Sequence, residues 1–372
     1  MKTKQLIPLV SLLSLAWLAG CNKNSEMPFG PKSGASSKQD QSDRRFSLNY
    51  QQVNLVADTP GLGGGRIDPK LGNAWGIAMS SSGAFWISAN HTGSAVIYDQ
   101  HGVQRRPPVS INLHGQKNGA SPDGVVTNET NDFFIHATSE NSHFIFATED
   151  GLLAAWGSGD SAVTVVDRSA TGAVYKGIAM GNVHGQNYLY VTNFNAAKIE
   201  VFNTHYNLES GFAFTDPTLP AGYAPFNIRL IDGKLYVTYA LQKPDKHDDQ
   251  AGPGNGFVDV FETDGAFVNR FASKGTLNSP WGIEEAPAAF GSGKETILVG
   301  NFGDGRINVF GTNGAFEGQL SEHGNPITID GLWGLTFAGN KEGAGFGNPP
   351  FLFFTAGPDD ENHGLFGYLE KR

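Results

Sequence analysis

The chain has 372 residues, a formal net charge of −10 at pH 7, and only 17% charged residues beside 49 glycines and 26 phenylalanines. This length allows one large core or several small ones. The high glycine and aromatic content favours short strands joined by tight turns and argues against a helical protein. The acidic balance argues against nucleic acid and anionic lipid as partners.

The first twenty residues have the pattern of a targeting segment. Lys2 and Lys4 precede an apolar run over residues 6–18, which is too short to span a bilayer. The run ends in Leu18-Ala19-Gly20-Cys21, which resembles the lipobox of bacterial lipoproteins, where the cysteine receives a diacylglycerol and the bond before it is cut. We therefore predict a signal peptide over residues 1–20 and lipidation of Cys21. Cys21 is the only cysteine, so the mature chain would contain no internal disulfide.

The lipidated cysteine and the polar segment after it, residues 21–50, are expected to form a flexible membrane tether, because this segment has almost nothing to bury. Asn22 follows the cysteine where Asp would favour retention in the inner membrane. The predicted location is therefore the cell envelope of a Gram-negative bacterium, lipid-anchored in the outer membrane, with the exposed side (periplasm or exterior) left open. Cleavage would remove Lys2 and Lys4 and leave 24 basic and 36 acidic residues, a net charge of −12.

Residues 51–372 contain six copies of a weak repeat. Each copy has a short apolar triplet, a strand, a polar turn and a second aromatic strand, and the clearest begins at Trp281-Gly282-Ile283. The triplets are centred on residues 76, 124, 177, 227, 282 and 334, a spacing of about fifty residues that is typical of propeller blades with long loops. The sequence therefore predicts an all-β fold, a six-bladed β-propeller of four-stranded blades. A β-sandwich would not need a fixed period, and a parallel β-helix would have a much shorter one.

A fourth, outer strand is expected in each of the first five units, at residues 109–113, 162–167, 211–215, 267–272 and 316–320. The sixth unit lacks one because the chain ends at Arg372, whereas residues 52–57 form an unassigned strand at the start. We predict that this N-terminal strand completes the last blade. The ring would then close without leaving an open sheet edge at the seam.

The clearest repeat also carries a resemblance. Its Pro280-Trp281-Gly282-Ile283 triplet, its strand ending in Asn301, and the later Gly305-Arg306-Ile307 and Val309-Phe310 resemble NHL-repeat six-bladed propellers. More closely, the chain is similar to a bacterial family of NHL-like propellers with no assigned activity, through phrases such as Gly222-Tyr223-Ala224-Pro225-Phe226-Asn227. The resemblance covers about residues 50–370. It implies the fold and supplies no catalytic residues.

Polar turns between the second and third strands are expected to lie on the same face as the loops that lead into the inner strands. Six-bladed lactonases and related hydrolases hold an ion in the channel at such a face, and the matching ligands here would be Asn90, Glu149, Asn193 and Asn301. Ca²⁺ prefers oxygen ligands of this kind, so Ca²⁺ is the candidate cofactor. The other interpretation is that Asn populates these turns because it tolerates left-handed backbone and bonds to its own turn.

The same face holds further candidates for ligand contact. Trp75, Trp281 and Trp333 could stack on a flat ligand, or they could be wedges buried between blades. The acidic candidates are Asp123, Asp304, Asp330, Asp359 and Asp360, either as binding residues on loops or as solvated charges. His247 and His363 lie in acidic loops without the spacing of a zinc site.

No nucleophile elbow, zincin motif, phosphate-binding loop or cysteine nucleophile is present in the sequence. Two hypotheses remain. The first is a membrane-anchored binding module that presents the loop-rich channel face to a protein or glycan. The alternative is a Ca²⁺-dependent lactonase-like or lyase-like enzyme with the ion in the central channel.

Overall fold

The computed structural model describes residues 48–113, 116, 119–338 and 350–372. The predicted signal peptide, Cys21 and nearly all of the tether lie outside these residues. Within the described part of the chain, no helix is long and apolar enough to cross a membrane.

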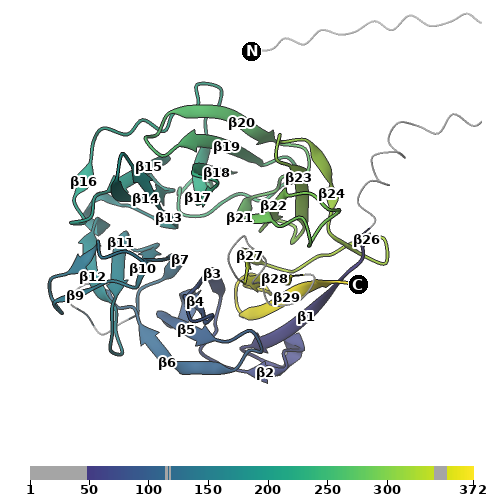
Figure 1. The fold of residues 1–372 in the computed structure, drawn as a ribbon, viewed down its shortest axis with the longest axis horizontal. Helices are drawn as coiled ribbons and strands as arrows, with labels where there is room; N and C mark the ends of the chain where they lie inside the picture. The colour runs from purple at the N-terminus through teal and green to yellow at the C-terminus, as the bar shows by residue number, and fades with distance from the viewer. Residues whose placement is uncertain (1–47, 114–115, 117–118, 339–349) are drawn as a thin grey trace, which may run out of the picture.

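Six sheets stand as blades around a central axis, which confirms the predicted six-bladed propeller (Figure 1). In each blade the strands run antiparallel from the axis outward. Blades 1 and 2 contain β3 (Ala74–Met79), β4 (Phe85–Ala89), β5 (Ser94–Tyr98), β6 (Gln104–Ser110), and β7 (Pro122–Thr127), β10 (Phe144–Thr148), β11 (Leu152–Trp156), β12 (Val163–Asp167). Blades 3 and 4 contain β13 (Tyr175–Val183), β14 (Gln186–Asn193), β15 (Lys198–Phe202), β16 (Leu208–Glu209), and β17 (Tyr223–Ile231), β18 (Lys234–Leu241), β19 (Gly256–Glu262), β20 (Phe267–Ser273).

Blades 5 and 6 contain β21 (Pro280–Ala286), β22 (Thr296–Asn301), β23 (Ile307–Gly311), β24 (Phe316–Gln319), and β27 (Leu332–Phe337), β28 (Leu352–Ala356), β29 (Leu365–Lys371), β1 (Tyr50–Ala57). Short elements decorate the connections: β2 (Arg66–Ile67), β8 (Phe134–Ile135), β9 (Glu140–Asn141), β25 (Ser321–Glu322), β26 (Asn325–Pro326), and the 3₁₀ turns η1 (Pro60–Leu62), η2 (Asn90–Thr92) and η3 (Ser169–Thr171).

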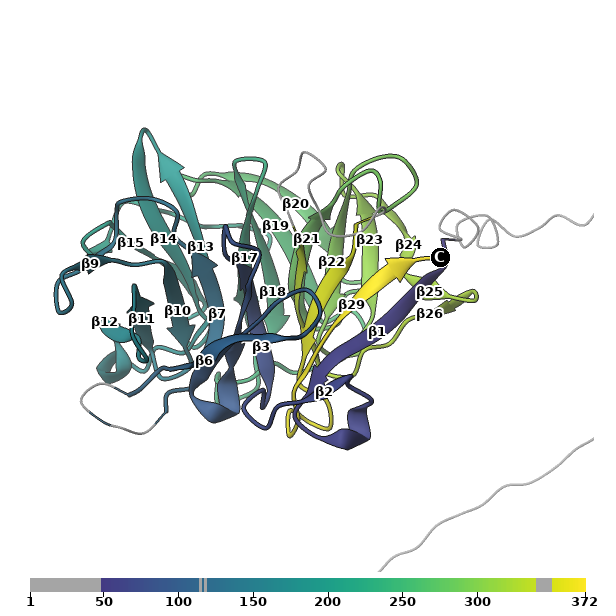
Figure 2. The same ribbon diagram turned by 60° about the horizontal axis from the view of Figure 1, so that its bottom comes forward.

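The N-terminal strand closes the ring, as predicted. β1 lies beside β29 in both views (Figures 1 and 2), antiparallel from the Tyr50–Lys371 pair to the Ala57–Leu365 pair. Tyr50 also donates a hydrogen bond to the carbonyl oxygen of Phe290 at 2.9 Å, which joins β1 to blade 5. The two ends of the described chain are thus held in the same blade.

Two of the expected outer strands are placed differently. β6 begins at Gln104, not at residue 109, and includes Pro107 and Pro108, because an outer strand pairs on one side only and tolerates residues without an N–H. In blade 3 the outer strand is β16, and residues 211–215 form no strand. The alternating Phe212 and Phe214 there pack on the ring of Tyr190, so the alternation reflects packing between blades.

The repeated triplets owe their glycines to close packing around the axis. At five of the six inner strands a Cβ would collide with the neighbouring blade: these are Gly76, Gly124, Gly177, Gly282 and Gly334. On Gly124, for example, it would lie 2.9 Å from both the carbonyl oxygen of Lys176 and the amide nitrogen of Ile178. Blade 4 has Asn227 instead, whose Nδ2 donates to the carbonyl oxygen of Trp281 at 2.8 Å. The triplets therefore set the distance between blades.

Candidate functional site

The polar candidates gather at one end of the central channel. We call this end the upper mouth: it is where the six inner strands begin and where the turns between second and third strands lie. The first residue of each triplet lies at the upper mouth. In blade order these residues are Trp75, Asp123, Lys176, Phe226, Trp281 and Trp333. Four are aromatic and two carry opposite charges on adjacent blades.

The aromatic members pack against one another across the channel. Trp75 stacks on Trp333 with ring centroids 3.5 Å apart and meets Trp281 edge-on at 5.7 Å. Phe302 stacks on Trp333 at 3.8 Å. The three tryptophans are at most 4% exposed, so they close the channel and offer little surface to a ligand. This geometry fits the packing interpretation, with contacts across the axis as well as between neighbouring blades.

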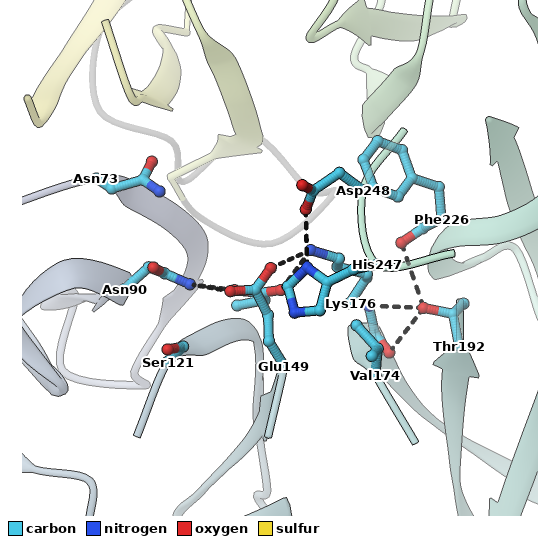
Figure 3. A network of polar contacts seen from close by, with 12 residues as sticks. Asn73, Asn90, Ser121, Glu149, Val174, Lys176, Thr192, Phe226, His247 and Asp248 are labelled. Carbon is cyan, nitrogen blue, oxygen red and sulfur yellow. Dashed lines mark hydrogen bonds and ion pairs between the residues drawn. The ribbon is translucent and has the colours of Figure 1, made fainter. Parts of the chain in front are cut away.

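The charged members belong to a buried network that also includes Glu149 and Asn90. Figure 3 shows Lys176, Glu149 and Asn90 of this network. Lys176 is 1% exposed, and its Nζ pairs with Glu149 and lies 3.7 Å from Asp123 Oδ2. The same Nζ lies 4.7 Å from the ring centroid of Trp75. Asn90 Nδ2 donates to Asp123 Oδ1 at 2.7 Å and to Glu149 Oε2 at 3.1 Å. The structure thus joins three predicted residues through a fourth, Lys176, that the sequence-based prediction omitted.

The signal for Lys176 was present in the repeat itself. The first residue of the triplet is aromatic in four blades, but it is a lysine in blade 3. The neighbouring blade 2 has an aspartate at the same position. A lysine at a channel-lining position would be costly without partners, since the desolvation of a lone ammonium is large. Comparing the six triplets position by position would therefore have predicted an ion pair.

The protonation states of the network follow from burial and neighbouring charge. Burial raises the pKa of Asp123, and the Glu149 carboxylate raises it further, against the lowering effects of Lys176 and Asn90. Burial also acts to raise the pKa of Glu149, but Lys176 outweighs it and the net shift is downward. Burial acts to lower the pKa of Lys176, and Glu149 and Asp123 reverse this to a net increase. These shifts favour the charged forms of Lys176 and Glu149 and, compared with an exposed aspartate, the protonated form of Asp123.

The rim of the upper mouth is formed partly by the long connection between β18 and β19. Its His247 Nδ1 lies 2.9 Å from Asp248 Oδ1, and both side chains are about half exposed. The Asp248 carboxylate raises the pKa of His247, and His247 in turn lowers the pKa of Asp248 to about 2. One ligand atom each from Glu149, His247 and Asp248 lies within 4.8 Å of the others, which makes a mixed nitrogen and oxygen donor set.

Blade 6 contributes a strained turn to the same rim. Asp359, Asp360 and Glu361 have φ values of 59°, 50° and 67°. A non-glycine residue in this region costs about 1–3 kcal/mol, and such residues cluster at functional sites. The turn brings Glu361 Oε2 to Asn73 Nδ2 at 2.7 Å, and Asn73 Oδ1 accepts from Trp333 Nε1 at 3.1 Å.

The environment of Glu361 shows how acidic this mouth is. Burial raises the pKa of the Glu361 carboxyl, and the charges of Glu149 and Asp248 add to the increase, against Asn73 and Lys176. Of the other acidic candidates, Asp330 Oδ2 accepts from the backbone N–H of Asp359 at 2.9 Å, and Asp360 is exposed.

The remaining predicted metal ligands make hydrogen bonds to their own turns and to neighbouring segments of the chain. Asn193 Oδ1 accepts from the backbone N–H of Ala196 at 3.2 Å. Asn301 Nδ2 donates to the carbonyl oxygen of Thr276 at 2.8 Å and to Asp304 Oδ1 at 3.0 Å. The contacts that join Asn90 to Glu149 do not include Asn193 or Asn301. The four-residue Ca²⁺ shell stays a prediction, and the donor atoms that do converge belong to Glu149, His247 and Asp248.

Comparison with known proteins gives relatives and a fold. No family model matches the sequence. Uncharacterized protein R648 of Acanthamoeba polyphaga mimivirus is 32% identical over 387 residues, covering 99% of this chain and 89% of its own length. Uncharacterized protein L690 of the same virus is 32% identical over 362 residues, covering 92% of this chain and 88% of its own.

Solved structures with a similar fold include two enzymes. The α-L-arabinofuranosidase Arb93A from Fusarium graminearum has a TM-score of 0.55 at 13% identity, covering 88% of this chain and 98% of its own. A streptogramin B lyase has a TM-score of 0.52 at 14% identity, covering 87% of this chain and 98% of its own. At these identities the likeness shows the propeller fold alone.

Proposed function

The chain belongs to the same family as the mimivirus proteins R648 and L690, and we propose that it is a binding module whose upper mouth holds the cationic group of a ligand. The proposal rests on one observation. At the upper mouth, four carboxyl groups from three blades interact electrostatically with one another. They belong to Asp123, Glu149, Asp248 and Glu361. Against them stand the buried ammonium of Lys176, the half-exposed His247, and Lys243, whose Nζ lies 3.8 Å from Asp248 Oδ2.

The carboxyl groups differ in how far a ligand can reach them. Asp123 is fully buried, and Glu149 is 15% exposed and already paired with Lys176. Asp248 is 47% exposed, and Glu361 lies at partial exposure on the rim. A ligand cation would therefore pair first with Asp248 and Glu361, while Lys176 keeps the deeper pair compensated. Burial raises the pKa of Glu361 and the Asp248 carboxylate raises that of His247, so a falling pH adds positive charge to this mouth, and binding should be tighter at pH 8 than at pH 5.

The membrane tether is part of the same proposal. We expect Cys21 to carry the lipid of an outer-membrane, NHL-like bacterial lipoprotein, because of its lipobox and the polar segment behind it. A flexible segment of 29 residues would have a root-mean-square span of roughly 30 Å, enough to hold the propeller away from a bilayer. Metabolic labelling with an alkyne fatty acid should tag the wild-type chain and not Cys21→Ala. Equal labelling of the wild-type chain and Cys21→Ala would contradict lipidation of Cys21.

The binding claim is tested with the mature chain carrying Cys21→Ser, titrated by calorimetry. The probes are a tetralysine peptide and, for the predicted glycan partner, cellotetraose. We expect saturable tetralysine binding that Asp248→Asn combined with Glu361→Gln weakens at least tenfold. Asp264→Asn with Glu129→Gln is the matched control, because it removes the same two charges from exposed positions, in the turn between β19 and β20 and in the connection after β7. Absence of tetralysine binding, or an equal loss in this control, would contradict the proposal, and preference for cellotetraose would point to a neutral glycan.

A metal-dependent lactonase-like or lyase-like enzyme is the second candidate, favoured by the convergence of Glu149, His247 and Asp248. Three protein ligands with one open position are typical of catalytic zinc, and such an ion would supply an activated water. The fit is incomplete, because Lys176 and Asn90 already engage Glu149. Elemental analysis of the protein purified without chelator should find about one metal per chain, lost in His247→Ala, if this candidate holds. If the protein contains no bound metal and its melting temperature does not change on adding Zn²⁺ or Ca²⁺, the binding module is the remaining candidate.

A further inference from the structure

The other end of the channel has a different character. We call it the lower mouth: it is where the inner strands β3, β7, β13, β17 and β27 end. A cavity of about 300 Å³ lies there, and its lining includes the apolar Met79, Val126, Met180, Leu230 and Phe337 and the polar Thr127, Arg229 and Thr336. This volume is at the lower end of the range for small-molecule sites, which begins at about 300 Å³.

The cavity is the open end of a blind channel. A narrower space of about 30 Å³ lies between the inner strands, lined by residues that include Gly76, Gly124 and Trp281. Beyond it the stacked tryptophans close the axis. Among the residues that the structure describes, no hydrogen-bond partner is found for the buried Nε1 of Trp281, and the narrow space is large enough for a water there. Among the described residues, the cavity opens at the lower mouth and ends beneath the aromatic cluster, so a ligand would enter from this side.

One charged side chain in the wall is available to fix a ligand. Arg229 lies on β17 with 34% of its side chain exposed, and its Nη2 pairs with Glu284 and lies 3.5 Å from Thr336 Oγ1. A guanidinium has five N–H donors in a planar fork, so one nitrogen in use leaves donors for a second acceptor. The geometry of a planar fork favours a carboxylate, which it can hold by two parallel hydrogen bonds.

We propose that the lower mouth binds a small carboxylate with an apolar body, such as a medium-chain fatty acid or an aryl acid. The carboxylate would pair with Arg229, and the apolar body would lie against Met79, Met180 and Phe337. Methionine walls adapt to apolar groups of different shape, which suits a class of ligand better than one compound. This site is independent of the upper mouth, which carries the opposite charge preference at the other end of the channel.

The test uses the mature chain with Cys21→Ser and three probes of equal length: octanoate, 1-octanol and octylamine. Calorimetry should show saturable 1:1 binding of octanoate, at least tenfold tighter than octanol, and no binding of octylamine. No octanoate binding at millimolar concentration, or octylamine binding as tightly as octanoate, would overturn the proposal.

Two variants locate the site. Arg229→Gln with Glu284→Gln replaces the ion pair by two neutral groups of similar size, and it should reduce octanoate affinity to that of octanol. Arg66→Gln, which removes an exposed guanidinium from β2, should leave binding unchanged. If the double variant does not fold, as judged by circular dichroism, Met180→Trp replaces it, since the larger ring should fill the cavity and abolish binding. Undiminished binding in a folded variant of either kind would place the ligand elsewhere and contradict the proposal.

Discussion

Replacing Lys176 by methionine is the sharpest perturbation of the buried network. The side chain is 1% exposed, pairs with Glu149, and lies 3.7 Å from Asp123 Oδ2. Methionine keeps much of the length and the apolar stem but removes the only ammonium in this network. Removing one partner of a buried pair costs about 3–5 kcal/mol, because an uncompensated charge is left behind. We expect Lys176→Met to reduce the free energy of unfolding by that amount at pH 8.

The pH dependence separates this cause from simple loss of packing. Without Lys176, burial raises the pKa of the Glu149 carboxyl, so the folded state holds a proton that the unfolded state releases. A carboxyl group whose pKa is higher in the folded state lowers the free energy of unfolding as the pH rises from its unfolded-state pKa through its folded-state pKa. The penalty of Lys176→Met should therefore be large at pH 8 and much smaller at pH 5.

Urea unfolding followed by tryptophan fluorescence measures the effect. Adding Glu149→Gln to Lys176→Met should restore most of the loss at pH 8, because the uncompensated charge is then gone. A penalty below about 1 kcal/mol, within the range of ordinary surface substitutions and their error, would refute the reasoning. So would a penalty that is equal at the two pH values.

Three further predictions concern the scaffold. Gly124→Ala should cost about 1–3 kcal/mol in urea unfolding, because the added Cβ meets the backbone of blade 3, whereas Gly211→Ala, at an open position, should change little. Burial raises the pKa of Asp259 to about 7 although its carboxylate pairs with Arg270, so the free energy of unfolding of the wild type relative to Asp259→Asn should fall between pH 4 and pH 8; a difference that is equal at the two pH values would disprove this origin. Deleting residues 48–58 should lower the melting temperature of the whole domain, because Tyr50 and Ala57 belong to the core between blades 5 and 6, and a mild local effect would contradict the closing role of β1.

Much of the fold follows from the sequence because the repeat is tied to packing. The triplet glycines mark where inner strands approach too closely for a Cβ, so their spacing gives the number of blades. β1 was predictable by elimination, because the last blade had only three strands and the N-terminal strand had no other blade to join. The outer strands were less predictable. β6 includes Pro107 and Pro108 and so begins five residues before the predicted start at residue 109, and Phe212 and Phe214 alternate because they pack on Tyr190.

The candidate site was predictable in part. Asn90, Asp123 and Glu149 were identified from turn positions, and the structure brings them together. Lys176 was not among the predicted site residues, although it breaks the aromatic pattern of the triplets. Glu361 lies in the acidic loop at residues 359–361 that was expected on this face, but its contact with Asn73 depends on packing between blades. The left-handed backbone of Asp359 and Asp360, which carries Glu361 toward Asn73, leaves no pattern in the sequence. Asn193 and Asn301 occupy the same kind of turn position as Asn90, so sequence alone cannot separate them.

Cation binding at the upper mouth is tested most directly by a crystal structure of the mature chain grown with the tetralysine peptide. We expect an ammonium group of the peptide within hydrogen-bond distance of the Asp248 or Glu361 carboxylate, with Lys176 still paired to Glu149. A peptide bound away from the upper mouth would contradict the proposed cation site. So would a metal ion held by Glu149, His247 and Asp248 with no peptide at that mouth.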